Sequence, residues 1–308
     1  MDKIVIVLKL NFILLRFLMG MKITENIKYL SLSACLTAIY SCSQEPSPLP
    51  TYLHLKPAQI TYQPAAGSIS QNIEDYWLYV GNDLLGVVPA DNIIPVIGEG
   101  IRDISIQPGI RANGLRDNAY IYPFLEPYRS QVQLCACTDT LAIQPVFEYK
   151  PTAKFSFIED FENSNRFTED ADQNLLTTAV TQSNVVAEGS YSLALNVDAS
   201  NKVNAITSQD FYNDFASDGR DVYLEFNYKS DFSFLVGLEA KFSGGNAIEF
   251  AYGIYPSDTW KKMYINLTDL IYASKSEEGY RPVFNITHPG GSAGPGYLYL
   301  DNIKLVHY

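Results

Sequence analysis

The sequence is poor in the residues that enzymes most often use for acid–base and metal chemistry. It holds 3 histidines and 4 cysteines among 308 residues, and the H-E-x-x-H motif of zinc proteases does not occur in it. Neither His54 nor His307 lies in a motif that is typical of a catalytic base. We therefore predict no catalytic residue and expect a protein that is not an enzyme.

Two partial catalytic patterns do not change this prediction. Gly290–Gly294 matches G-x-S-x-G around Ser292, but a nucleophile elbow needs a helix after the serine, and Pro295 and Gly296 follow here. This segment is typical of a flexible loop. The neighbouring acids at positions 159, 160 and 162 lack a glycosidase spacing, although two carboxyls on distant strands could still pair.

Long uncharged apolar runs are also lacking, because Lys9 and Arg16 interrupt the apolar residues 1–20. A membrane segment of roughly 20 residues there stays the less favoured alternative to a misassigned start codon. The run at 29–39 has the length of a signal-peptide core, and Lys22 and Lys28 supply its positive flank. We interpret residues 1–41 as a signal peptide, with translation starting at Met1 or, alternatively, at Met21.

The residues that follow this run predict a lipid anchor. Ser41-Cys42 resembles a bacterial lipobox, which implies that Cys42 is acylated and begins the mature chain. Three prolines between residues 43 and 50 predict an extended tether that could not bury an ordinary thiol. Ser43–Glu45 resembles the export tags of Bacteroidota surface lipoproteins. We expect an outer-membrane lipoprotein, facing the periplasm or the cell surface.

Basic residues are scarce, with 22 Lys and Arg against 34 Asp and Glu. Without residues 1–42, the chain keeps 17 basic and 32 acidic residues, a net charge of −15. Such a chain repels phosphate backbones and anionic lipid, so we expect no nucleic-acid binding and membrane attachment only through the lipid. The acidity leaves room for a calcium ion.

A helical apolar period is absent, and short alternating runs between glycine and proline turns predict an all-β fold. We expect two tandem β-sandwich domains after the lipoprotein signal peptide. Residues 51–152 suit an immunoglobulin-like sandwich, with a hairpin turn at 81–83. Pro151 marks the expected boundary, and residues 153–308 form the second sandwich.

The second half carries a family resemblance. Its segments "FIEDFEN", "EGSYSLALNV", "DTWKKMYINLTDL" and "GYLYLDNIKLV" resemble the galactose-binding-like jelly roll of carbohydrate-binding modules. The resemblance implies glycan binding or, alternatively, a non-catalytic scaffold that binds another envelope protein. It also implies a structural calcium ion that joins the first and last strands through Glu162 and Asp301.

Strand alternation predicts which side chains could meet a ligand. We expect an inward set of apolar residues, namely Val222, Leu224, Phe226, Tyr228, Ile248, Phe250, Tyr252, Ile254, Met263, Ile265 and Leu267. Their neighbours must then face outward: Tyr223, Asn227, Glu249, Tyr264 and Asn266. Tyrosines mixed with amides and a carboxylate suit sugars, because rings pack on a pyranose while polar groups take its hydroxyls. The same mixture also suits a protein interface.

Smaller features leave alternatives open. Cys135 and Cys137 lie two residues apart, which allows buried thiols, a disulfide or, least favoured, two metal ligands. Asp170, Asp172 and Asn174 begin like a calcium loop but lack its glycine and glutamate, which favours a solvated acidic loop. We expect both tryptophans, at positions 77 and 260, to lie in the core.

Overall fold

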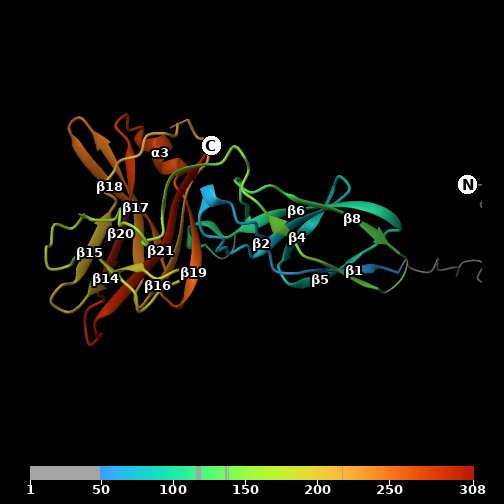
Figure 1. Cartoon of the computed structure of the whole chain (residues 1–308), viewed down its shortest axis with the longest axis horizontal. Helices are drawn as coiled ribbons and strands as arrows, with labels where there is room; N and C mark the ends of the chain where they lie inside the picture. Colours follow the sequence, from blue (N-terminus) through green and yellow to red (C-terminus); the bar gives the residue numbers. More distant parts are fainter. Residues whose placement is uncertain (1–48, 116–118, 136, 138, 217) are drawn as a thin grey trace, which may run out of the picture. The chain divides into compact units, whose positions relative to one another are not determined.

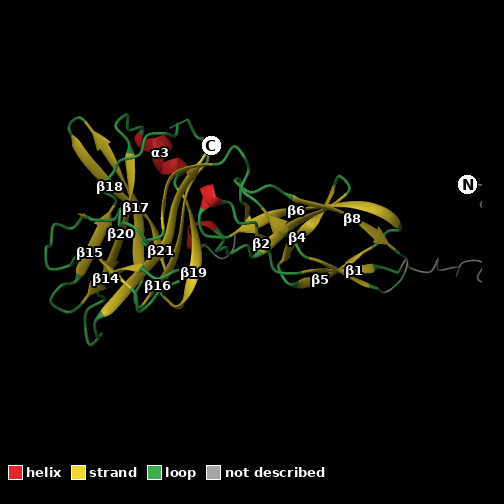
Figure 2. Cartoon of the chain, in the orientation of Figure 1, coloured by secondary structure: helices red, strands yellow, loops and turns green. Residues whose placement is uncertain are grey.

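The computed structural model describes residues 49–308, apart from residues 116–118, 136, 138 and 217. The predicted signal peptide, Cys42 and most of the tether therefore lie outside the described residues. Residues 50–308 form one compact unit. Strands make up most of it (Figure 2), which confirms the all-β prediction. Within the described part of the chain, no helix is long and apolar enough to cross a membrane.

The N-terminal region, residues 51–147, is a small sandwich of antiparallel and parallel strands. One sheet has the order β5-β1-β9, a second pairs β10 with β2, and a third runs β4-β3-β6-β7 with β8 also on β6. Their bounds are β1 Thr51–Leu55, β2 Gln59–Ile60, β3 Asp75–Val80, β4 Asp83–Pro89, β5 Asn92–Val96, β6 Gly100–Ile110, β7 Tyr120–Ile121, β8 Tyr128–Leu134, β9 Thr140–Ile143 and β10 Val146–Phe147, with the short 3-10 turns η1 Pro64–Ala66 and η2 Ala112–Gly114.

The C-terminal sandwich, residues 154–307, is a jelly roll of two antiparallel sheets (Figure 1). The six-stranded sheet runs β13-β14-β21-β16-β19 with β11 on β21, and the five-stranded sheet runs β12-β15-β20-β17-β18. The bounds are β11 Lys154–Glu159, β12 Glu169–Asp170, β13 Val180–Gln182, β14 Ser192–Val197, β15 Val203–Thr207, β16 Val222–Ser230, β17 Phe234–Phe242, β18 Gly245–Ile254, β19 Ser257–Asn266, β20 Tyr280–Thr287 and β21 Gly296–His307, with helix α3 at Thr268–Ser274.

Local sequence explains several of these elements. The hairpin between β3 and β4 turns at Gly81, whose φ of 62° favours glycine, so the predicted turn at 81–83 is confirmed. Alternation along β16 places Leu224 and Phe226 in the core between the two sheets, also as predicted. Every described strand ladder lies within 51–147 or within 154–307. The domain boundary and the immunoglobulin-like assignment stay predictions.

Candidate functional site

The outer face of the six-stranded sheet is covered by the N-terminal region. Tyr223 on β16 and Tyr264 on β19 are 4% and 2% exposed and belong to the same apolar cluster as Tyr122 and Phe124. The Tyr122 ring centroid lies 5.6 Å from that of Tyr223 and 5.0 Å from that of Tyr264. These two tyrosines do point away from the sandwich core, as predicted, but our expectation that they are open to a ligand is wrong.

The other predicted ligand-face residues divide between the two sheets. Asn266 is the cross-strand partner of Tyr223, and its Nδ2 donates to the Tyr223 hydroxyl at 3.0 Å. Asn227 is buried, and its Oδ1 accepts a hydrogen bond of 2.6 Å from Ser70 of the N-terminal region. Glu249 is exposed on β18, in the five-stranded sheet. The structure therefore brings four of the five together, in a contact between regions rather than on an open surface.

A buried charge cluster lies in the same contact. Glu225 Oε2 and Lys262 Nζ form an ion pair at 3.1 Å without hydrogen-bond geometry, and both side chains are almost fully buried. Tyr122 and Tyr149 donate their hydroxyls to Glu225 Oε1. Burial alone would raise the pKa of the Glu225 carboxyl. The positive charges of Lys262 and Lys304 outweigh this effect, so the pKa lies below its usual value. The carboxylate stays ionised and joins the two regions.

The outer face of the five-stranded sheet has a different character. Core residues Phe234, Val236 and Leu238 alternate on β17 with Leu235, Gly237 and Glu239, which face outward. The strand register extends this outward face across the sheet. Its members, which we call the open face, are Leu235, Gly237 and Glu239 on β17, Ile248 and Phe250 on β18, Arg281, Val283 and Asn285 on β20, and Ala205 and Thr207 on β15.

Three apolar side chains of the open face are exposed. Leu235 is 40%, Ile248 41% and Phe250 38% exposed. We predicted Ile248 and Phe250 as inward residues, and this is wrong. The register shifts between Val236 and Gly237, so that Phe250 pairs with Gly237 while Tyr252 pairs with Val236. The bulge reverses the side-chain parity of the first half of β18, which turns Ile248 and Phe250 outward.

A polar cluster lies beside these apolar groups. Arg281 Nε donates to Glu239 Oε2 at 2.8 Å, and Asn246 Nδ2 donates to Glu239 Oε1 at 2.7 Å. The Arg281 guanidinium also lies 4.3 Å from the Phe211 ring centroid. Both charged side chains of the pair are largely buried and therefore fixed in position. The open face thus offers a small apolar surface bordered by oriented polar groups, and no sequence pattern pointed to Leu235 or Arg281.

Glu162 and Asp301, the predicted calcium ligands, both accept hydrogen bonds from the loop at residues 187–191. Glu162 Oε1 accepts from the backbone N–H groups of Ser190 and Tyr191, and Asp301 Oδ2 accepts from those of Ala187 and Glu188. No described group of three acids, histidines or cysteines brings ligand atoms together around them. Both carboxylates act as loop acceptors here, and the calcium ion stays a prediction that chelation followed by thermal melting would test.

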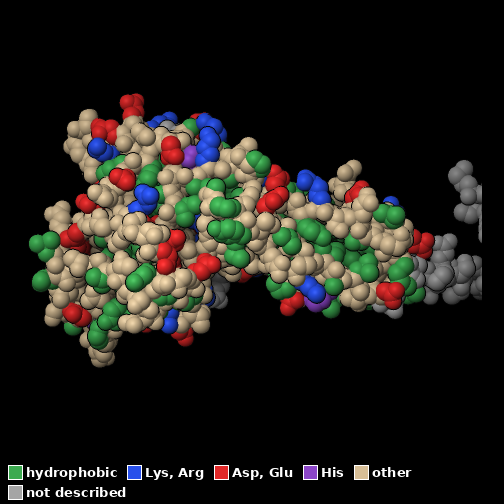
Figure 3. Space-filling view, in the orientation of Figure 1, with side chains coloured by type: hydrophobic (Ala, Val, Ile, Leu, Met, Phe, Trp, Pro, Cys, Tyr) green, Lys and Arg blue, Asp and Glu red, His purple; other side chains and the backbone are tan. Residues whose placement is uncertain are grey.

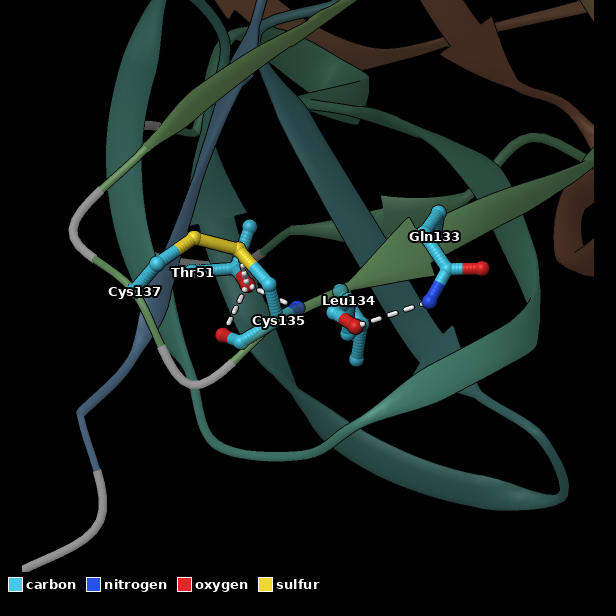
Figure 4. The surroundings of a disulfide bond; sticks show 5 residues. All are labelled: Thr51, Gln133, Leu134, Cys135 and Cys137. Atoms are coloured by element: carbon cyan, nitrogen blue, oxygen red, sulfur yellow. Dashed lines mark hydrogen bonds between the residues drawn. A yellow bond between two sulfur atoms is a disulfide. The ribbon is translucent and has the colours of Figure 1, made fainter.

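Cys135 and Cys137 form a disulfide at the end of β8 (Figure 4). The buried-thiol interpretation is therefore wrong, and the disulfide alternative is confirmed. Thr51 fixes the loop, because its hydroxyl donates to the Cys135 carbonyl at 2.8 Å and accepts from the Cys135 N–H at 2.9 Å. Asp139 completes the one described cluster of possible metal ligands, but thiols in a disulfide are not available as thiolates.

The remaining motifs have structural environments. Ser292 lies in a turn between β20 and β21, so a strand follows it where a nucleophile elbow requires a helix. Asp170 and Asp172 accept N–H groups of their own loop. Trp77 and Trp260 are half-buried rather than core residues. Trp77 alternates with the buried Tyr76 and Leu78 on β3, and Trp260 lies between two exposed residues on β19.

Comparisons with known proteins give structural likenesses only. No family model and no curated protein matches the chain. The xylan-binding family 22 module of Paenibacillus barcinonensis Xyn10C matches with 11% identity and a TM-score of 0.36, over 50% of this chain and 95% of that one. The family 30 carbohydrate-binding module of Clostridium thermocellum Cel9D-Cel44B matches with 18% identity and a TM-score of 0.35, over 50% and 96%. The fold described above stands on the chain's own strand pairing.

Proposed function

We propose that the protein is a lipid-anchored envelope protein that binds a glycan, without catalysis, on the open face of its C-terminal sandwich. The observation that carries the proposal is the exposed group of Leu235, Ile248 and Phe250 beside the fixed Glu239–Arg281 pair. An apolar surface takes the CH face of a pyranose ring, and oriented polar groups take its hydroxyls. The opposite sheet is excluded, because the N-terminal region covers its outer face at Tyr223 and Tyr264.

Substitution of Phe250 tests this proposal. The full mature chain is screened on an array of neutral oligosaccharides, and the strongest ligand is then titrated by calorimetry. Phe250→Ala should raise Kd at least tenfold, about 1.4 kcal/mol, with little change in melting temperature because the ring is 38% exposed. Tyr255→Ala is the control, since Tyr255 is 77% exposed outside the open face. An array without binding, or equal affinity of Phe250→Ala and wild type, would contradict the proposal.

Lipid anchoring rests on the sequence, on the apolar run at 29–39 and the Ser41-Cys42 junction. Metabolic labelling with a fatty-acid analogue should mark the wild type and not Cys42→Ser. Cys35→Ser is the matched control, because Cys35 lies within the apolar run and should leave labelling unchanged. Equal labelling of Cys42→Ser and the wild type would refute the anchor.

A protein partner is the second candidate function, and one surface feature favours it. Leu175 and Leu176, between β12 and β13, are 84% and 77% exposed, which is unusual for two adjacent leucines. Copurification from detergent-solubilised envelopes should then depend on these leucines. A Leu175→Ser/Leu176→Ser variant that still binds every array glycan but loses its copurifying protein would favour this candidate.

A further inference from the structure

The N-terminal region has an outer sheet face of its own that no predicted function uses. Tyr76 and Leu78 of β3 lie in the core, so Trp77 and Tyr79 point to the opposite face. The register continues this face onto the next strands: Tyr79 pairs with Ser105 of β6, and Ser105 pairs with Arg129 of β8. One row across the sheet thus consists of Tyr79, Ser105 and Arg129.

A second row lies beside the first. Asp103 of β6 pairs with Gln131 of β8, and Gln131 Nε2 donates to Asp103 Oδ1 at 2.9 Å. The β6 and β8 members of the two rows line an open cavity of about 420 Å³, a volume within the range of small-ligand sites. Its lining residues are Gly81, Asp103, Ile104, Ser105, Arg129, Ser130 and Gln131.

The polar groups of the cavity have unused hydrogen-bonding capacity. Among the residues that the structure describes, Arg129 makes no hydrogen bond or ion pair, so its guanidinium donors face the cavity or solvent. The hydrogen bond between Gln131 Nε2 and Asp103 Oδ1 leaves Asp103 Oδ2 and Gln131 Oε1 able to accept hydrogen bonds from a ligand. One positive and one negative side chain leave the cavity formally neutral, which favours a neutral ligand over a charged one.

Apolar groups border the cavity on its other side. Tyr79 is half-buried, and its cross-strand neighbour on β4 is Leu84, which is 47% exposed. Trp77 and Val87 form the next row, and the buried Trp77 Nε1 has no described acceptor. Figure 3 shows hydrophobic side chains gathered on the visible face of the N-terminal region, with charged ones around them.

We propose that this cavity binds one or two sugar units of a neutral saccharide, as a second glycan site that is separate from the open face. Ser105, Asp103, Gln131 and Arg129 hydrogen-bond the hydroxyls. Tyr79, the cross-strand neighbour of Ser105, packs beside the ring. Two sites on one chain would bind a long glycan more tightly than either alone. The proposal does not depend on the first site, because none of its residues lies in the C-terminal sandwich.

Saturation-transfer NMR on the full mature chain tests the inference. The probes are cellotriose, mannotriose and maltotriose, with trigalacturonate as the charged comparator. At least one neutral trisaccharide should give a signal, and Arg129→Ala and Gln131→Ala should each raise its Kd at least tenfold. Arg102→Ala is the matched control, an exposed neighbouring arginine that does not line the cavity and should leave Kd within twofold.

The two sites are distinguished by running the same titrations in the Phe250→Ala background. Loss of the remaining signal on adding Arg129→Ala supports the second site, whether or not Phe250 itself affects binding. Three results would overturn it: no signal from any neutral probe, unchanged affinity in both cavity variants, or tighter binding of trigalacturonate. Melting curves check that each variant is folded, which we expect because Arg129 and Gln131 are exposed.

Discussion

Lys304 is a buried lysine in the contact between the two regions. It is 0% exposed, and its Nζ donates to the Ser68 carbonyl at 2.7 Å. Burial lowers the pKa of this lysine to about 8, an effect that Lys262 strengthens and Glu225 opposes. Near neutral pH, keeping this buried lysine charged lowers the free energy of unfolding. The destabilisation decreases once the lysine loses its proton.

The contribution of Lys304 to the free energy of unfolding should therefore rise with pH between about 8 and 10. In this window the unfolded chain, whose lysine titrates near 10.5, binds more protons than the folded chain. The free energy of unfolding should increase by up to roughly 1.4 kcal/mol per pH unit relative to a variant without this lysine. Urea unfolding of wild type and Lys304→Met at pH 8, 9 and 10 measures that difference. Parallel pH profiles for the two proteins would show that the shift is absent.

At the scale of elements, the bulge between β17 and β18 decides which side chains reach the open face. Gly237 sits at the bulge, and a Cβ there would lie 2.3 Å from the Glu249 carbonyl oxygen and 2.9 Å from Phe250 Cδ1. Glycine thus lets the two strands approach closely enough to turn Phe250 outward. Gly253, across from Leu235 on the same pair of strands, has no such restriction.

Gly237→Ala should destabilise the fold by roughly 1–3 kcal/mol, because the backbone of β18 must move away. The same change should weaken glycan binding at the open face, since it displaces Phe250. Gly253→Ala is the matched control, because its Cβ would meet Leu235 Cδ2 at an ordinary 3.8 Å. Denaturant titration of both variants provides the comparison, and equal stabilities would mean that the bulge does not require glycine.

At the scale of the whole molecule, the two regions share a core. Tyr223, Tyr264 and Val306 of the C-terminal sandwich belong to the apolar cluster of the N-terminal region. The Tyr264 hydroxyl accepts a hydrogen bond from the Asn72 N–H at 3.1 Å, and the charge cluster at Glu225 lies beside it. Neither region can therefore open at this contact without exposing aromatic surface and a buried carboxylate.

Tyr223→Ala/Tyr264→Ala should consequently lower stability rather than act on binding alone. Deleting large buried aromatic side chains costs roughly 3–5 kcal/mol each, so the melting temperature should fall by many degrees. Tyr272→Ala is the control, with a ring that is 51% exposed on α3. Calorimetry gives the answer, and a double variant that melts like the wild type would show that the contact contributes little.

Sequence alone was sufficient for the properties that depend on near neighbours. The all-β class, the hairpin at Gly81 and the inward positions of Leu224 and Phe226 follow from turn chemistry and a period of two. The outward parity of Tyr223 and Tyr264 followed from the same period. Each of these depends on a few consecutive residues and holds where, as in β16, the strand keeps its alternation.

Only the tertiary structure decided which outward face is open. Alternation says that Tyr223 points away from its own sandwich, but Tyr122, about a hundred positions earlier in the chain, covers it. A single bulge reversed the parity of Ile248 and Phe250, and its cause is the close approach of Gly237 to another strand. Coverage and strand register depend on partners distant in the sequence, and a periodic pattern within one strand carries no information about them.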